Sequence, residues 1–131
     1  MRIISGEFKG KILISPDNNE IRPTSDRGKE VIFDTLSSIL YKQDKEYKEI
    51  NILDIFCGSG SLGIEAISRG GKNIFFIDNS KNAINLTKMN CEKLNIKNVN
   101  LLNYNFFDIN LSLIKQADVI FLDRCRKRQG T

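Results

Sequence analysis

The sequence predicts an α/β protein whose parallel β-sheet carries helices on both faces. From Ile50 onward, short apolar runs alternate with stretches in which apolar residues recur at helical spacing, a pattern typical of βαβ units. A glycine-rich turn, Gly58 to Gly63, joins the first apolar run to the helical stretch after it, and Asp78 ends the second apolar run. Because parallel strands need crossover connections, the intervening helices indicate a parallel sheet.

The first part of the chain predicts a small extension followed by a helix. Residues 1–14 alternate loosely between apolar and polar types and contain two glycines, which suits a short β-hairpin or two strands with a tight turn. Residues 15–24 are rich in turn formers and are expected to be extended. A helix is expected from about Ser25, capped by Thr24, Ser25 or Asp26, because apolar residues then recur at helical spacing.

The remaining elements follow one another regularly. The charged run 41–49 is expected to be a helix end or a solvated connection. No internal repeat or low-complexity tract interrupts the pattern, and 131 residues suit one domain. The expected elements are, in order, a strand at 50–56, a helix at 60–69, a strand at 72–78, a helix at 80–95, a strand at 99–105, a short helix at 109–115 and a strand at 117–123.

The composition excludes several kinds of function. Hydrophobic residues make up 40% and charged residues 27% of the chain, no apolar run approaches bilayer length, and the N-terminus lacks the apolar segment of a signal peptide, which favours a cytoplasmic protein. The chain has no histidine, and Cys57, Cys91 and Cys125 form no CxxC pair. No metal site is therefore expected, and catalysis of the Ser-His-Asp or Cys-His kind is excluded.

The net charge of +4 does not by itself indicate nucleic-acid binding. Basic and acidic residues balance over residues 1–50 and again over 51–123, so the whole excess lies in residues 124–131. A general electrostatic argument for RNA binding therefore fails. A local excess remains at the start of the chain, where Arg2, Lys9 and Lys11 accompany a single acidic residue.

The glycine turn has the spacing of a nucleotide-binding loop. Gly58, Gly60 and Gly63 fit G-x-G-x-x-G between an expected strand and an expected helix, the setting in which this match is meaningful. Glycines permit a tight turn and let a ligand lie against bare backbone at the carboxyl end of the sheet. We therefore expect a cofactor site at this turn.

Two carboxylates specify the ligand further. Asp78 lies 20 residues after Gly58 at the end of a strand, where a carboxylate can accept hydrogen bonds from both ribose hydroxyls of an adenosine. Asp54 precedes the first glycine by four residues, where its charge suits an ammonium or sulfonium and repels a pyrophosphate. This favours S-adenosylmethionine over a dinucleotide. The alternative is that both aspartates cap the turns that follow them.

The segment after the third expected strand could meet the adenine. Asn105 could hydrogen-bond the base edge and Phe106 could pack on its face. Ordinary turn chemistry with core aromatic residues explains the same segment equally well.

These segments together resemble the bacterial 16S rRNA guanine-N2 methyltransferases of the RsmD type. The resemblance runs from residue 1 to Asp123, and the combination is more specific than any one segment. The matching segments are Arg2-Ile3-Ile4-Ser5-Gly6, Lys9-Gly10-Lys11, Arg22-Pro23-Thr24-Ser25-Asp26-Arg27, Leu53-Asp54-Ile55-Phe56-Cys57-Gly58-Ser59-Gly60, Leu62-Gly63-Ile64-Glu65-Ala66 and Ser68-Arg69-Gly70.

The resemblance implies a Rossmann-like class I methyltransferase sheet and methyl transfer from S-adenosylmethionine to the exocyclic amine of a guanine in 16S rRNA, in the small ribosomal subunit or an assembly intermediate. It divides the chain into an N-terminal RNA-binding extension (1–24), a partial methyltransferase core (25–123) and a basic tail foreign to the family (124–131). It implies that cofactor contacts come from Asp54, Gly58, Gly60, Gly63, Asp78, Asn105 and Phe106, RNA contacts from Arg2, Lys9, Lys11, Arg22 and Arg27, and catalysis from Asp123.

The match departs from the family after Asp123. The family continues with Asp-Pro-Pro-Phe/Tyr, whereas Asp123 is followed here by Arg124, Cys125 and Arg126. The prolines present a backbone carbonyl to the target amine and the aromatic residue stacks on the flipped base, so we expect weak cofactor binding and poor methyl transfer. The family's further strands are also missing, so the last strand is expected to be an apolar edge open to self-association.

Three other functions remain open from the sequence. An amino-methyltransferase acting on another base, such as the N6 of adenine, would share the cofactor site, because the missing motif is what separates the two. A non-catalytic module could use the same glycine pocket for an adenosine ligand. A dinucleotide-binding domain would need an uncharged strand end before the glycines, and Asp54 argues against it.

Overall fold

Four parallel strands form the centre of the structure, a computed structural model that describes residues 1–15, 24–97, 99–105, 108 and 111–122. The strands lie in the order β3-β2-β1-β4, and all three pairings are parallel. This confirms the predicted parallel α/β sheet. The strands are β1 (Asn51–Ile55), β2 (Asn73–Asp78), β3 (Asn100–Asn103) and β4 (Val119–Leu122).

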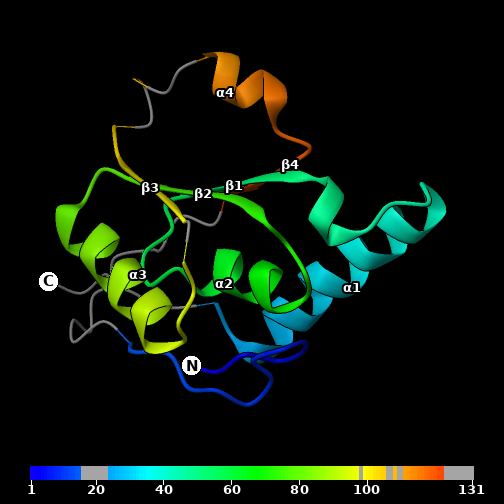
Figure 1. Ribbon diagram of the computed structural model, residues 1–131, viewed down its shortest axis with the longest axis horizontal. Helices are drawn as coiled ribbons and strands as arrows, with labels where there is room; N and C mark the ends of the chain where they lie inside the picture. Colours follow the sequence, from blue (N-terminus) through cyan, green and yellow to red (C-terminus); the bar gives the residue numbers. More distant parts are fainter. Residues whose placement is uncertain (16–23, 98, 106–107, 109–110, 123–131) are drawn as a thin grey trace, which may run out of the picture.

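The helices lie on both faces of the sheet, as predicted. Viewed along the sheet edge, α1, α2 and α3 lie on one face and α4 lies alone on the other (Figure 1). The chain therefore changes face between β3 and β4, which places a topological switch point between β1 and β4, where ligands of open α/β sheets bind. The bounds are α1 (Asp26–Lys42), the 3₁₀ helix η1 (Tyr47–Glu49), α2 (Ser61–Ser68), α3 (Lys81–Lys93) and α4 (Leu111–Gln116).

The core lies mainly between the sheet and the three-helix layer. Phe76 of β2 is fully buried there, and Phe121 of β4 packs edge-to-face on Phe33 of α1 with ring centroids 5.4 Å apart. On β4, which is an edge strand of the described sheet, the exposed fractions of Ile120 and Leu122 are 42% and 60%. These two side chains give the described sheet an apolar edge, the feature on which the prediction of self-association rests.

The start of α1 agrees with its predicted cap. Ser25 is the N-cap, and its hydroxyl accepts a hydrogen bond from the Gly28 amide at 3.0 Å. Ser25 was one of three capping residues expected, and its short side chain satisfies an amide that has no partner within the helix.

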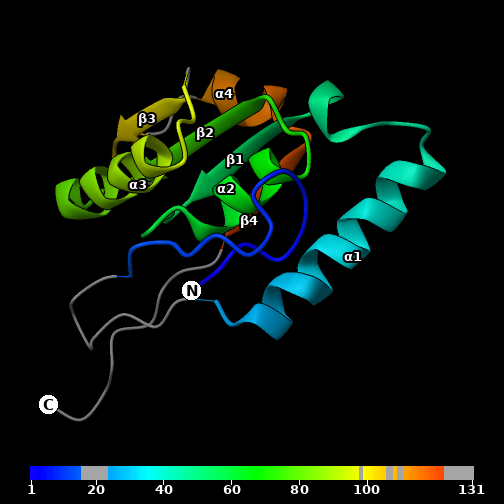
Figure 2. The ribbon, with the colours of Figure 1, turned by 60° about the horizontal axis from the view of Figure 1, so that its bottom comes forward.

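The N-terminal segment, residues 1–15, contains less β-structure than expected. Its two arms pair through one antiparallel bridge, between Arg2 and Ile12, and through backbone hydrogen bonds from Ile3 to Lys11 and from Leu13 to Met1. Gly6 and Gly10 both have positive φ and shape the wide turn between them. The segment lies against α2 and α3 (Figure 2), and most of the expected extended stretch 15–24 lies outside the described residues.

A buried ion cluster fixes this segment to the helices. Glu65 of α2 is fully buried, and its carboxylate accepts hydrogen bonds from the amides of Ile4 at 2.9 Å and Ser5 at 3.1 Å. Arg69 donates to the same carboxylate at 3.0 Å, and the ammonium of Lys29 lies 3.7 Å from it. Lys29 also donates to the Arg2 carbonyl, and burial lowers its pKa from the ordinary value. Glu65 is thus the shared acceptor of two cations and two amides.

Within the described residues, no helix is both long and apolar enough to cross a membrane.

Candidate functional site

The glycine loop lies at the carboxyl end of β1, as the motif predicted. The Gly60 amide donates to the Cys57 carbonyl at 2.7 Å, which closes a tight turn. Gly58 and Gly60 have φ of 56° and 83°, and Phe56 just before them has φ of 61°. Positive φ is uncommon for a bulky residue and costs on the order of 1–3 kcal/mol, and such residues cluster at ligand-binding sites. The strained Phe56 is a site feature that the sequence did not indicate.

Asp54 lies beneath the loop rather than at its surface. Its exposed fraction is 2%, and its Oδ2 accepts a hydrogen bond from the Gly63 amide at 2.9 Å. Gly63 is the third residue of α2, so the carboxylate caps that helix from the neighbouring strand. The negative charge lies at the positive end of the helix, where it offsets the dipole that would attract an anion.

Asp78 ends β2 beside the loop and holds it. Its Oδ2 accepts from the Gly58 amide at 3.1 Å and its Oδ1 accepts from the Ser80 amide at 2.9 Å. A carboxylate offers about four acceptor positions, so capacity remains on both oxygens for two hydroxyl donors. The capping role and the proposed ribose role are therefore compatible at this residue.

Gly63 serves packing between helix and sheet. A Cβ at this position would lie 2.2 Å from the Phe76 ring, and both residues are buried. This is the close helix–strand approach that the third glycine of such motifs permits.

Substitution of Gly63 by alanine is expected to lower the free energy of unfolding by about 1–3 kcal/mol, because the added methyl overpacks a close-packed core. Urea denaturation followed by circular dichroism measures the change. Alanine at Gly28, in the first turn of α1, is the matched control, because its φ is not positive and an added Cβ would meet only the side chains of Ser25 and Thr24, at 3.1 Å. An equal loss in both variants would contradict the packing role.

Two α3 residues that the sequence analysis missed hold the loop from below. The Thr87 hydroxyl donates to the Gly58 carbonyl at 2.9 Å, and the Asn90 side-chain amide donates to the Ser59 carbonyl at 2.9 Å. Both side chains are fully buried. Their spacing of three positions on a helix places them on one face, and polar residues on an otherwise apolar face were the available signal.

The loop also fits a small polar ligand. The Ser61 hydroxyl, whose residue is 6% exposed, has no hydrogen-bond partner among the described residues. Buried hydroxyls are normally hydrogen-bonded, so an unpaired one beside a glycine loop favours a ligand contact there. With Asp54 and Asp78 supplying negative charge, the residues present fit a cationic adenosyl ligand.

The end of β3 lies next to the end of β2. The Asn103 side-chain amide donates to the Asp78 carbonyl at 3.0 Å, which joins the ends of the two strands. Asn105 follows and is exposed. Phe106 and Asp123, the other expected contacts, lie outside the described residues.

The expected RNA contacts differ in their surroundings. Arg2 pairs with Asp26 at 3.0 Å, so part of its charge is already offset. Lys9, Lys11 and Arg27 are exposed, and Arg22 lies outside the described residues.

No group of potential metal ligands occurs among the described residues. The two described cysteines, Cys57 and Cys91, are free and buried. Burial raises the pKa of the Cys57 thiol well above its usual range, with a smaller contribution from the charge of Asp54. Burial likewise raises the pKa of Cys91 to about 11. Because the thiolate is the nucleophilic form, neither side chain suits nucleophilic catalysis at neutral pH.

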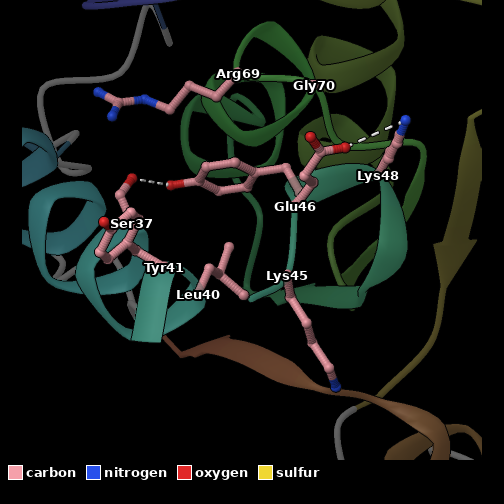
Figure 3. Close-up of a pocket in the computed structure, with 9 residues that line it drawn as sticks. Ser37, Leu40, Tyr41, Lys45, Glu46, Lys48, Arg69 and Gly70 are labelled. Carbon is pink, nitrogen blue, oxygen red and sulfur yellow. Dashed lines mark hydrogen bonds and ion pairs between the residues drawn. The ribbon is translucent and has the colours of Figure 1, made fainter. Parts of the chain in front are cut away.

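A surface cavity of about 380 Å³ lies elsewhere on the molecule. It is lined by residues that include Leu40 of α1, Tyr47 of η1 and Gly70 after α2 (Figure 3). Tyr47 hydrogen-bonds Ser37 at 2.7 Å across it. These segments lead into the beginnings of β1 and β2. The cavity therefore lies at the amino ends of the strands, opposite the glycine loop at their carboxyl ends, and is separate from the candidate site.

Comparison with known proteins identifies relatives of this chain. The family described as Conserved hypothetical protein 95 matches residues 1–125. Ribosomal RNA small subunit methyltransferase D of Haemophilus influenzae is 38% identical over 90 residues, which cover 69% of this chain and 43% of that protein. The protein of the same name from Escherichia coli K12 is 41% identical over 69 residues, which cover 53% of this chain and 31% of that protein. The chain thus spans less than half the length of these curated relatives.

A solved structure is similar over nearly the whole chain. The Escherichia coli protein yhhF, provisionally described as a methyltransferase, aligns with a TM-score of 0.73 and 28% identity, covering 94% of this chain and 63% of that one. The likeness confirms the predicted Rossmann-like fold class.

Proposed function

Because the chain belongs to the family described as Conserved hypothetical protein 95, the RsmD-type methyltransferases that its sequence resembles, we propose that its glycine crevice binds S-adenosylmethionine for methyl transfer to RNA. The acceptor in this proposal is the exocyclic N2 of a guanine in small-subunit rRNA. The names of the curated relatives, which are ribosomal RNA small subunit methyltransferases, support the RNA substrate.

One observation carries the choice of cofactor. The Asp54 carboxylate occupies the Gly63 amide in the first turn of α2. In dinucleotide-binding proteins, free amides at this helix end bind the pyrophosphate. A buried carboxylate there repels a pyrophosphate and attracts a sulfonium, so the electrostatics favour the methyl donor.

The chain's own residues supply binding and orientation. In this proposal Asp78 accepts hydrogen bonds from the ribose, Gly58 and Gly60 let the ligand approach the backbone, and Asp54 balances the ligand's positive charge. The cofactor supplies the methyl group as an electrophile on its sulfonium, and Asp123 accepts a hydrogen bond from the target amine.

We further propose that methyl transfer by this chain is slow. Asp123 is followed by Arg124 and Cys125 in place of the family's two prolines. Without that rigid turn the target amine is poorly oriented, and misplacement of a reacting group by about 1 Å can cost a hundredfold in rate.

A methyl-transfer assay tests both proposals. Small ribosomal subunits stripped of protein, or assembly intermediates, would be incubated with labelled S-adenosylmethionine and the nucleosides identified by mass spectrometry. We expect slow formation of N2-methylguanosine. Formation of N6-methyladenosine would contradict the base specificity, and rapid turnover would contradict the impairment. Binding of the donor and its demethylated product with equal affinity and no turnover would instead favour a non-catalytic adenosine module.

The exposed lysines of the N-terminal segment are proposed to contact RNA phosphates. The double variant Lys9→Gln/Lys11→Gln is expected to reduce the salt dependence of RNA binding, with the slope of log K against log salt falling by about 1 per lysine removed. Fluorescence anisotropy with labelled rRNA fragments at several salt concentrations measures this slope. Lys72→Gln/Lys97→Gln, which removes two exposed lysines elsewhere, is the control, and an unchanged slope in the first variant would contradict the proposal.

A further inference from the structure

We propose that Asn90 is a positioning residue that couples the N-terminal segment to the glycine loop, so that cofactor binding and ordering of that segment reinforce each other. The inference rests on the proposed function, because it concerns how the same crevice is regulated. It is independent of which base is methylated.

Asn90 holds both partners with one side chain. The amide of Ile14 donates to its Oδ1 at 2.6 Å, and its Nδ2 donates to the Ile14 carbonyl at 3.1 Å. The same Nδ2 donates to the Ser59 carbonyl at 2.9 Å. A fully buried side chain therefore replaces a strand partner for Ile14 and supports the glycine loop at the same time.

A second contact joins the same two segments. The Ser59 hydroxyl donates to the sulfur of Met1 at 3.4 Å, and the Leu13 amide donates to the Met1 carbonyl at 3.0 Å. Movement of residues 1–14 therefore changes the support of Ser59 from two directions.

Other α3 residues contact one partner only, which provides matched controls. Thr87 donates to the Gly58 carbonyl of the loop, and Lys93 donates to the Ile12 carbonyl of the N-terminal segment at 2.8 Å. The bridging role thus belongs to Asn90 among these three.

Because Asn90 bonds both Ile14 and Ser59, binding of the cofactor at the loop is linked to the order of the N-terminal segment. A ligand that orders Ser59 and its neighbours fixes the Asn90 amide, and this in turn holds Ile14. By linkage, if the cofactor strengthens the binding of a second ligand to the ordered N-terminal segment by some factor, that ligand strengthens cofactor binding by the same factor. A polyanion on Lys9 and Lys11 would be one such ligand.

Hydrogen exchange of the full chain tests the coupling. With saturating S-adenosylhomocysteine, the Ile14 amide is expected to exchange slower by about fivefold or more, while the Asn51 amide, which Asp118 holds outside the segment and the loop, is unchanged. In Asn90→Leu the ligand is expected to bind about tenfold more weakly, and at saturation the Ile14 response disappears. In Lys93→Met and Thr87→Val that response is retained.

The outcomes separate the two proposals. S-adenosylhomocysteine that binds the wild-type chain without slowing Ile14 exchange overturns the coupling and leaves the proposed function standing. A full response in Asn90→Leu overturns the role of Asn90. Absence of any binding to the wild-type chain overturns the proposed function and the coupling with it. Because the wild-type response alone is decisive, the proposal stays testable even where Asn90→Leu fails to fold.

Discussion

Replacing Asp78 with alanine is expected to weaken S-adenosylhomocysteine binding by about a hundredfold or more, since each hydrogen bond to a charged group contributes about 1.5–3 kcal/mol. The variant loses the proposed acceptor of the ribose hydroxyls. It also releases the Gly58 and Ser80 amides, which the carboxylate holds at 3.1 and 2.9 Å. Isothermal titration calorimetry measures the affinity directly.

A matched aspartate controls for the loss of a backbone contact. The Asp118 carboxylate accepts a hydrogen bond from the Asn51 amide at 2.8 Å. Asn51 begins β1, so this contact lies at the amino ends of the strands, away from the glycine loop. Asp118→Ala is expected to bind the ligand like the wild-type chain. Unchanged affinity in Asp78→Ala, or an equal loss in both variants, would contradict the ribose role.

Replacing Glu65 with alanine is expected to lower the free energy of unfolding by about 3–5 kcal/mol, because breaking a buried ion pair leaves uncompensated charge. Lys29 and Arg69 both lose their carboxylate, and the amides of Ile4 and Ser5 lose their acceptor. Urea denaturation measures the loss. Glu46→Ala, which removes an exposed partner of Lys48, is the control and is expected to change little.

Lys29→Met tests which charge the cluster needs. Glu65 keeps Arg69 and both amides in this variant, so its stability at neutral pH is expected to stay close to wild type. The lowered pKa of Lys29 means that the unfolded chain binds more protons than the folded chain just below pH 10.5. The free energy of unfolding therefore rises with pH between the lowered pKa of Lys29 in the folded chain and its ordinary value in the unfolded chain. This rise is expected to be absent in Lys29→Met. A loss in Lys29→Met as large as in Glu65→Ala would show that the lysine is the essential charge.

The regular part of the fold was predictable because its signals are local. Apolar runs with β propensity and stretches of helical spacing gave all four strands and the four α-helices within a few residues, and Ser25 was among the caps expected. The wide turn of the N-terminal segment was missed because its backbone bonds to Glu65 and Ser68, more than 50 residues away in sequence.

The candidate site was predictable in position but not in detail. Glycine spacing located the loop, and the ends of β1 and β2 located Asp54 and Asp78. Capping of the following turns was the alternative role expected for both carboxylates, and both accept hydrogen bonds from backbone amides. Which amides they bind could not be read from spacing, because it depends on side-chain direction. Asn90 and Thr87 were missed for the same reason, since an asparagine or threonine in a helix is usually solvated and only the packing of α3 on the loop buries them.

The most direct test of the central claim is calorimetric titration of the folded chain with S-adenosylmethionine, S-adenosylhomocysteine and NAD. The account predicts saturable binding of the two adenosyl ligands at one site per chain and none of NAD, because Asp54 places a negative charge where a pyrophosphate would lie. Binding of NAD, with no heat from either adenosyl ligand, would contradict it.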